Sequence, residues 1–434
     1  MIFLKHRKKI LIFLAVCFAV LFFSYIRIIT ALPGKLTLLE GEEYVYDFKS
    51  PLLISIKADK EGVVKLNNSE SKNSNASPIS LKSIKKGCVN LQMRIFGVIP
   101  LKTMEINVVP NKVIAACGNT VGVKLKISGI LVIGLSDVED LNGNRSIPAK
   151  QSGLKPGDLI MQVNQVKMGN IDDLIGEINK SEGGKITITY KHGDIYNNVD
   201  IKPVKSADDK KYHIGLWVRD STAGIGTLTF YDPETKRFGA LGHGITDLDT
   251  GTLMPVKSGE ILESSILAIK KGRQGNPGEL KGVFIEDKNK LGVINDNCDY
   301  GIYGTLNNDA VDRISGRLYP IALRNQVKEG PATILTNVNG NSIEEYGVEI
   351  QKVSKQKLNS AKGMVIKITD KKLLDLSGGI VQGMSGSPII QDGRIVGAVT
   401  HVLVNDPTRG YGIFIEKMLQ NILENTAIDL KQAS

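Results

Sequence analysis

Apolar and polar residues alternate along much of this chain, which is the pattern of β-strands. In the segment 44–48 aromatic side chains occupy every second position, and the stretch from 205 to 434 shows apolar alternation broken by turns. Successive side chains of a strand point to opposite faces, so this period of two predicts half-buried strands. Helical spacing is scarce and is clearest near 171–179 and 415–425. The pattern predicts a mainly β protein.

The N-terminal segment differs from the rest of the chain. Four basic residues within positions 5–9 precede an apolar run from Ile10 to Phe23, which Arg27 then interrupts. A positive flank before an apolar run keeps the N-terminus in the cytoplasm, while the rest crosses the membrane. The run is long for a signal-peptide core and short for a span, unless Ile28 and Ile29 extend it and Arg27 snorkels. We predict an uncleaved signal anchor at 1–32, with a cleaved signal as the alternative, and an extracytoplasmic remainder.

Three further domains are predicted beyond the anchor. Short strands at 35–112 suggest a small β-domain that serves as a spacer or docking piece. Residues 113–204 hold a Gly-Leu-Lys-Pro-Gly-Asp-Leu-Ile block at 153–160, before a strand and a helix. Residues 205–434 consist of short alternating segments and turns, which is typical of an antiparallel barrel. We predict that this last domain carries the chemistry.

The block at 153–160 resembles the turn before a strand in PDZ domains of the bacterial type. The resemblance implies that the domain at 113–204 accepts an extended peptide as an added strand beside its helix. Val121, Gly122 and Val123 are then expected to form the carboxylate-binding loop and the groove strand. The alternative is a groove that the protein's own chain fills and that serves only packing.

Composition excludes several classes of function. The 434 residues are 42% hydrophobic with 45 glycines, as in a folded, strand-rich protein. The net charge of +10 is spread along the chain without a dense run beyond the first ten residues, so we expect no nucleic-acid partner. The four cysteines lie far apart without a Cys-x-x-Cys pair, and we expect no metal and no cofactor. A disulfide between Cys88 and Cys117 is left open.

The segment 383–388, Gly-Met-Ser-Gly-Ser-Pro, has the form on which chymotrypsin-type serine proteases carry their nucleophile. A serine hydroxyl attacks only when a nearby base takes its proton. The glycines allow a tight turn, in which the amides of Gly383 and Ser385 can face the oxyanion that forms during attack. Apolar runs on both sides predict flanking strands. We therefore predict that Ser385 is a catalytic nucleophile rather than part of a structural turn.

A histidine is the expected base, and the chain has five. His6 lies in the cytoplasmic tail, while His192 and His213 belong to the PDZ-like region and its boundary. His243 follows a strand in a small-residue turn, Gly-Ala-Leu-Gly-His-Gly, and precedes Ser385, as in chymotrypsin-like folds. We predict His243 as the base and keep His401, on the strand after the serine, as the alternative.

A carboxylate is expected to orient this histidine, and its identity does not follow from spacing. Placement well upstream of the serine favours Asp296 or Asp299, whereas Asp370 ends a predicted strand shortly before Ser385. The candidates between His243 and Ser385 are Asp247, Asp249, Asp287, Asp296, Asp299 and Asp370.

Taken together, these motifs resemble the stage IV sporulation protein B peptidase family of endospore-forming bacteria. An N-terminal anchor, a PDZ-like domain, Gly-Ile-Gly-Thr-Leu-Thr-Phe, Ala-Leu-Gly-His-Gly-Ile and Gly-Met-Ser-Gly-Ser-Pro occur in this order. The resemblance implies a triad of His243, Asp370 and Ser385. It also implies a peptidase secreted from the forespore, which cleaves itself and then a partner that restrains an intramembrane protease, so that a late sigma factor is activated.

We therefore expect a membrane-anchored, chymotrypsin-like serine endopeptidase with a PDZ regulatory domain. Its expected partners are a protein substrate in the envelope or intermembrane space, itself as substrate, peptide tails at the PDZ-like domain, and the membrane. Two alternatives remain. One is an inactive scaffold or receptor that binds peptides; the other is a general envelope quality-control protease, which would cleave unfolded proteins at many sites.

Overall fold

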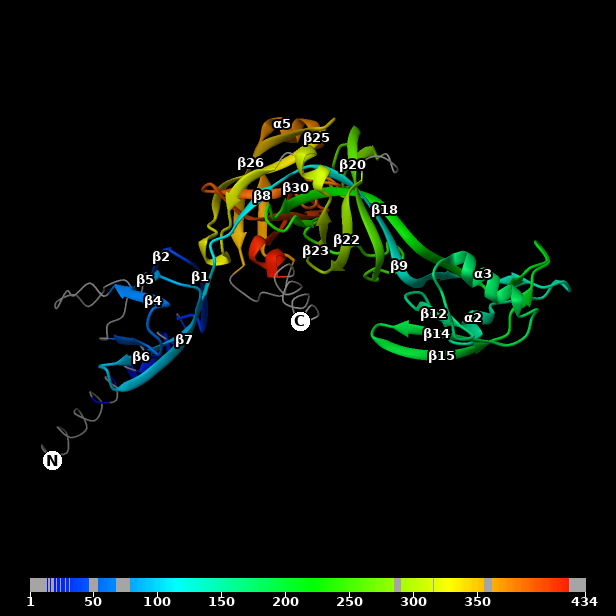
Figure 1. The fold of residues 1–434 in the computed structure, drawn as a ribbon, viewed down its shortest axis with the longest axis horizontal. Helices are drawn as coiled ribbons and strands as arrows, with labels where there is room; N and C mark the ends of the chain where they lie inside the picture. The colour runs from blue at the N-terminus through cyan, green and yellow to red at the C-terminus, as the bar shows by residue number, and fades with distance from the viewer. Residues whose placement is uncertain are drawn as a thin grey trace, which may run out of the picture. The chain divides into compact units, whose positions relative to one another are not determined.

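The computed structural model describes residues 32–46, 54–67, 79–284, 290–314, 316–354 and 361–420, and single positions between 14 and 30. The chain divides into two compact units, Met1–Lys112 and Val113–Ser434. Both units are built mainly from β-strands (Figure 1), which confirms the predicted fold class at this level.

The first unit holds two small sheets. One has four strands, in the order β1 (Lys35–Leu39), β7 (Ile99–Val109), β6 (Gly87–Ile95) and β3 (Ile54–Ala58). The other has three, in the order β2 (Glu43–Tyr46), β5 (Ile79–Ser83) and β4 (Val64–Asn67). Alternate residues of β6 are buried, and Leu81, Leu91 and Ile106 are fully buried in the core between the sheets. The strand period in the sequence therefore predicted this unit well.

Most of the predicted anchor lies outside the described residues. The positions that the structure does describe between 14 and 30 are helical. No helix within the described part of the chain is both long enough and apolar enough to cross a membrane. The anchor at 1–32 accordingly stays a prediction.

In the second unit, six strands pair in a ring that forms a first barrel. The ring closes because β9 pairs with β18 as well as with β20. Val123, Leu125 and Ile261 are buried in its core. In order around the ring, the strands are β9 (Thr120–Leu135), β20 (Val256–Lys270), β22 (Lys290–Cys298), β23 (Gly301–Leu306), β19 (Arg237–Ala240) and β18 (Leu216–Tyr231).

A second closed barrel follows along the chain. Ile334, Ile350 and Ile366 fill it and are fully buried. The barrel that the sequence predicts in this part of the chain is therefore confirmed. In order around this barrel, the strands are β25 (Gly330–Asn339), β26 (Ser342–Val353), β27 (Met364–Ile368), β30 (Asp406–Phe414), β29 (Arg394–Leu403) and β28 (Pro388–Gln391).

The PDZ-like portion is inserted into the first barrel through two long strands. β9 and β18 have 16 residues each and run side by side (Figure 1). One half of each strand belongs to the barrel, and the other half packs with β12 (Leu159–Val163), β14 (Ile186–His192), β15 (Ile195–Ile201) and α3 (Ile171–Lys180). Asn170 precedes helix α3 and caps it, because its side chain accepts a hydrogen bond from the Asp173 amide.

This insertion corrects the predicted boundary at 204/205. The strand β8 (Val113–Ala116) and the first half of β9 pack in the first barrel rather than in the PDZ-like core, as Ala115 and Val121 show. Conversely, Ile214 is buried in the PDZ-like core. Strand pairing across more than a hundred residues decides the boundary, and local pattern does not report such pairing.

The predicted peptide groove at Val121, Gly122 and Val123 is wrong. These residues pair with β18 on one edge and with β20 on the other. A Cβ atom on Gly122 would also lie 2.6 Å from the ring of Phe284. Strand addition needs a free edge with unpaired amides and carbonyls. This part of β9 has none, so it is barrel core.

The corrected boundary predicts how truncated chains behave. A chain of residues 113–434 keeps both barrels and is expected to unfold cooperatively on heating. A chain of residues 205–434 lacks β8 and β9, so its first barrel opens. Losing several core side chains, each worth about 2–5 kcal/mol, exceeds the stability of an ordinary domain. Thermal unfolding followed by near-ultraviolet circular dichroism distinguishes the two, and a cooperative transition in the shorter chain would contradict the assignment.

Candidate active site

Ser385 lies in a turn between α5 (Lys371–Ser377) and β28. Gly383 and Gly386 on either side have φ angles of 97° and 100°, in the left-handed region that favours glycine. A Cβ atom on Gly386 would lie 2.1 Å from the Thr227 carbonyl oxygen and 2.6 Å from the Leu241 nitrogen. The second glycine of the motif therefore lets this turn press against the first barrel.

Every carbonyl from Gln382 to Ser385 accepts a hydrogen bond. The donors are the Leu280 amide for Gln382 (2.8 Å), the Thr227 hydroxyl for Gly383 (2.7 Å), the Ser387 amide for Met384 (3.0 Å) and the Thr227 amide for Ser385 (3.0 Å). By contrast, the amides of Gly383 and Ser385 donate to no acceptor within the described residues. The N–H and C=O of one peptide point in opposite directions, so fixing the carbonyls of Gln382 and Met384 also fixes these two amides.

Two fixed, unpaired amides are what an oxyanion requires. The turn is half-buried at Gly383 and Ser385, and backbone amides in such places are normally paired. Donors that are already oriented stabilise a developing negative charge without reorganising during the reaction. The arrangement at Gly383 and Ser385 can therefore hold the oxyanion of an acyl-transfer reaction.

His243 lies in the turn after β19, beside the serine turn. Leu241 and Gly242 before it have φ angles of 68° and 70°, so the chain bends sharply at this point. His243 Nδ1 lies 2.9 Å from the Gly244 carbonyl oxygen. A ring nitrogen bonded to a carbonyl carries the proton, which leaves Nε2 with the lone pair. Burial lowers the pKa of His243 and the bond to Gly244 opposes this, so the ring stays neutral and able to accept a proton.

Strand β29 joins the two turns. The Ser385 hydroxyl donates to the Thr400 carbonyl, and a Cβ atom on Gly242 would lie 3.0 Å from the Thr400 methyl group. The next residue, His401, lies against His243, with ring centroids 4.7 Å apart and an angle of 37° between the rings. In this resting geometry the serine hydroxyl is bonded to Thr400 and not to His243. Attack requires the Ser385 hydroxyl to rotate toward the His243 imidazole. Hydrogen bonds between a nucleophile and its base often form only when substrate is bound.

His401 is exposed on one side and in contact with His243 on the other. Partial desolvation lowers the pKa of His401, and repulsion from His243 when that ring is protonated and from Lys362 lowers it further. Protonation of His401 is therefore unfavourable when His243 beside it carries a proton. The structure thus brings His243, Ser385 and the alternative base His401 together.

The structure does not bring Asp370 to His243. Its side chain caps α5, accepting hydrogen bonds from the amides of Leu373 (3.0 Å) and Gly347 (3.4 Å). Within the described residues it forms no ion pair or hydrogen bond with a histidine. Asp370 as the orienting acid stays a prediction from the family resemblance, and it requires the carboxylate to leave the helix cap.

The other carboxylates differ in position. Asp299 is exposed in the turn between β22 and β23. This turn lies beside the His243 turn, as shown by the 2.7 Å that would separate a Cβ atom on Gly244 from the Cys298 carbonyl oxygen. Asp247 is buried and bound to Arg219 and to the Thr250 amide, which fits a structural role. Asp249 also contacts Arg219, and Asp287 lies outside the described residues. Asp296 lies on β22, paired with Tyr303 of β23. Asp299, in the turn beside the His243 turn, is therefore the structural alternative to Asp370 that we test.

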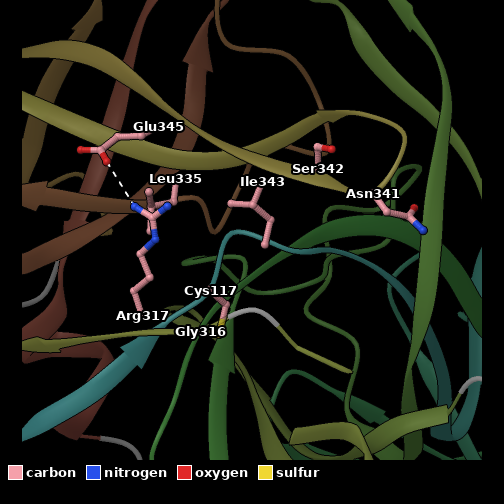
Figure 2. Close-up of a pocket in the computed structure, with 8 residues that line it drawn as sticks. All are labelled: Cys117, Gly316, Arg317, Leu335, Asn341, Ser342, Ile343 and Glu345. Atoms are coloured by element: carbon pink, nitrogen blue, oxygen red, sulfur yellow. Dashed lines mark ion pairs between the residues drawn. The ribbon is translucent and has the colours of Figure 1, made fainter. Parts of the chain in front are cut away.

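A cavity of about 410 Å³ lies elsewhere in the second unit (Figure 2). Its polar lining includes Arg317 and Glu345, which form an ion pair at 3.5 Å. None of the predicted catalytic residues lines it. Cys117, which also lines it, is buried, and its thiol donates to the Ala115 carbonyl (3.4 Å). Both Cys117 and Cys88 are free cysteines, so no disulfide joins the two. The cavity is separate from the serine turn.

Sequence reasoning missed Thr227, although it lies in the Gly-Ile-Gly-Thr-Leu-Thr-Phe motif. Its side chain is fully buried, and its hydroxyl and amide hold two carbonyls of the serine turn. The available signal was a threonine within the mostly apolar motif Gly-Ile-Gly-Thr-Leu-Thr-Phe, because a buried hydroxyl normally has a hydrogen-bond partner.

Two barrels, a serine turn with two free amides and a neutral histidine beside it define a serine peptidase. The model of the SpoIVB peptidase S55 family matches residues 210–419, and this match supports a SpoIVB-type serine peptidase.

Two solved structures are similar to parts of the chain. The PDZ domain of the SdrC-like protein Lmo2051 from Listeria monocytogenes shares 28% identity over 21% of this chain and 90% of its own, with a TM-score of 0.18. The active form of the Rv3671c protease from M. tuberculosis shares 12% identity over 46% of this chain and 72% of its own, with a TM-score of 0.25. Both TM-scores are low, so the assignment rests on the family match and the site.

Replacing each candidate acid by its amide tests the third member of the site. Asparagine caps a helix as well as aspartate does, so Asp370→Asn is expected to change the free energy of unfolding by less than about 0.5 kcal/mol. If Asp370 orients His243, the same change lowers the rate of Ser385 labelling by a fluorophosphonate about 10²- to 10⁴-fold.

Asp299→Asn is the matched control for this prediction and is expected to label at the wild-type rate. The reverse result, with Asp370→Asn active and Asp299→Asn inactive, would move the acid to the turn between β22 and β23.

Proposed function

We propose that this peptidase is a membrane-anchored, self-cleaving endopeptidase that acts in sporulation signalling. The observation that carries the catalytic part is the pair of free, oriented amides at Gly383 and Ser385. The match to the SpoIVB peptidase family supports the biological part. The proposed substrate is a peptide bond in a protein of the extracytoplasmic space.

In the proposed reaction, Ser385 Oγ attacks the carbonyl carbon of the scissile peptide while His243 Nε2 takes the hydroxyl proton. The carbonyl oxygen becomes an oxyanion and accepts hydrogen bonds from the amides of Gly383 and Ser385. His243 then gives its proton to the leaving amine, and the C–N bond breaks to leave an acyl-enzyme. Water, activated by the same histidine, hydrolyses the ester and restores Ser385. Asp370 is assigned the orienting role by family resemblance.

The proposed partner is a protein that restrains an intramembrane protease. Its cleavage would release that protease and so activate a late sigma factor in the mother cell. This assignment is supported by the match of residues 210–419 to the SpoIVB peptidase family. The N-terminal segment at 1–32 would hold the enzyme at the forespore membrane, with both barrels in the space between the two membranes. No cofactor is part of the proposed chemistry.

We assign regulatory peptide binding to a different edge from the one that the sequence predicted. Residues 216–219 of β18 pair with β9 on one side, and no described strand pairs with their other side. Helix α3 lies beside this segment, since the Ile171 amide donates to the carboxylate of the next residue, Asp220 (3.0 Å). A free edge beside a helix suits an extended peptide tail.

Self-cleavage tests the proposed function. The full-length chain and its Ser385→Ala variant are incubated separately, and their fragments are followed by intact mass. We expect fragments at a few sites from the wild type and none from the variant. Mixing the two then shows whether cleavage occurs between molecules.

Identical fragmentation of both forms would contradict self-cleavage. Added unfolded casein separates the sporulation role from general quality control. Broad degradation of casein at rates similar to self-cleavage would favour the quality-control protease.

A further inference from the structure

We propose that Thr227 is a positioning residue for the reaction, because it sets the direction of the two oxyanion amides. The inference rests on the proposed role of Ser385 as nucleophile. Thr227 lies in the barrel half of β18 and is fully buried.

Thr227 contacts both turns of the site. Its hydroxyl donates to the Gly383 carbonyl (2.7 Å) and its amide to the Ser385 carbonyl (3.0 Å). Its own carbonyl accepts a hydrogen bond from the Leu241 amide (3.1 Å), two residues before His243. One residue of the first barrel therefore links the nucleophile turn of the second barrel to the turn of the base.

The hydroxyl acts on the peptide plane between the two free amides. This plane joins Gly383 to Met384, and it lies between the plane that carries the Gly383 amide and the plane that carries the Ser385 amide. The Thr227 hydroxyl holds its oxygen, and the Val381 carbonyl accepts from its N–H at 3.1 Å. The two outer peptide planes are each held by a bond to their own carbonyl, of Gln382 or of Met384. Holding the middle plane at its oxygen and at its N–H keeps the directions of these two outer planes constant relative to each other. Without the Thr227 hydroxyl, the Gly383 carbonyl oxygen loses its hydrogen-bond partner, and the flexible backbone of Gly383 then allows the peptide plane between Gly383 and Met384 to rotate.

Thr229, two residues further along the same strand, provides a matched control. It is also fully buried, but its hydroxyl has no hydrogen-bond partner within the described structure. Valine has nearly the same shape as threonine. Thr229→Val therefore removes a buried hydroxyl without removing a bond, whereas Thr227→Val removes the bond to Gly383.

The test uses the full-length chain and a fluorophosphonate probe. Ser385 Oγ forms a bond to phosphorus, the P–F bond breaks, fluoride leaves, and His243 accepts the hydroxyl proton. The phosphoryl oxygen of the product occupies the oxyanion position, so the maximal labelling rate reports how well the amides are placed. We expect Thr227→Val to lower this rate about ten- to a hundred-fold, with little change in the probe concentration for half-maximal rate. Thr227→Ser, which restores the hydroxyl, is expected to regain most of the rate, and Thr229→Val to match the wild type.

Melting temperatures of all variants are measured alongside the labelling rates. A wild-type rate in Thr227→Val would overturn the inference, as would an equal loss in Thr229→Val, which would mark a general effect of changing the strand. Failure of Thr227→Ser to regain activity would also count against the hydroxyl. If the wild type itself is not labelled while folded, the proposed nucleophile fails, and the role of Thr227 with it.

Discussion

The alternation of bonded and free amides in the serine turn is the constraint on which the site depends. The amides of Gln382, Met384 and Gly386 donate to backbone carbonyls, whereas those of Gly383 and Ser385 between them donate to none in the described part of the chain. Glycine at 383 and 386 permits the turn, and close contact with the first barrel holds it. The chemistry thus follows from backbone geometry that two barrels impose together. Neither barrel alone supplies both the turn and its support.

Strand β18 connects the serine turn to the PDZ-like portion of the second unit. One half of this strand holds the nucleophile turn, and the other half forms the free edge beside α3 in the PDZ-like portion. A strand is hydrogen-bonded along its length, so a peptide added to the edge would bind the very element that carries Thr227. A ligand changes activity only if it binds two states of such an element with different affinity. The insertion through β9 and β18 connects the proposed peptide edge to the strand that supports the serine turn.

Local features were predictable from the sequence, and long-range ones were not. The serine turn was recognisable because its glycines and flanking apolar runs lie within a few residues of one another. The histidine turn was found by elimination among five candidates. The groove was misplaced because an apolar–Gly–apolar pattern occurs at 121–123 and again at 214–216, and only strand pairing tells which has a free edge. The acid stayed open because its distance from His243 depends on how loops from several strands meet.

The most direct test of the account is a crystal structure of the wild-type protein after reaction with a fluorophosphonate. The account predicts phosphorus bonded to Ser385 Oγ, with the phosphoryl oxygen about 2.7–3.1 Å from the amide nitrogens of both Gly383 and Ser385. An adduct on another residue, or a phosphoryl oxygen that points to solvent while the two amides bond elsewhere, would contradict it.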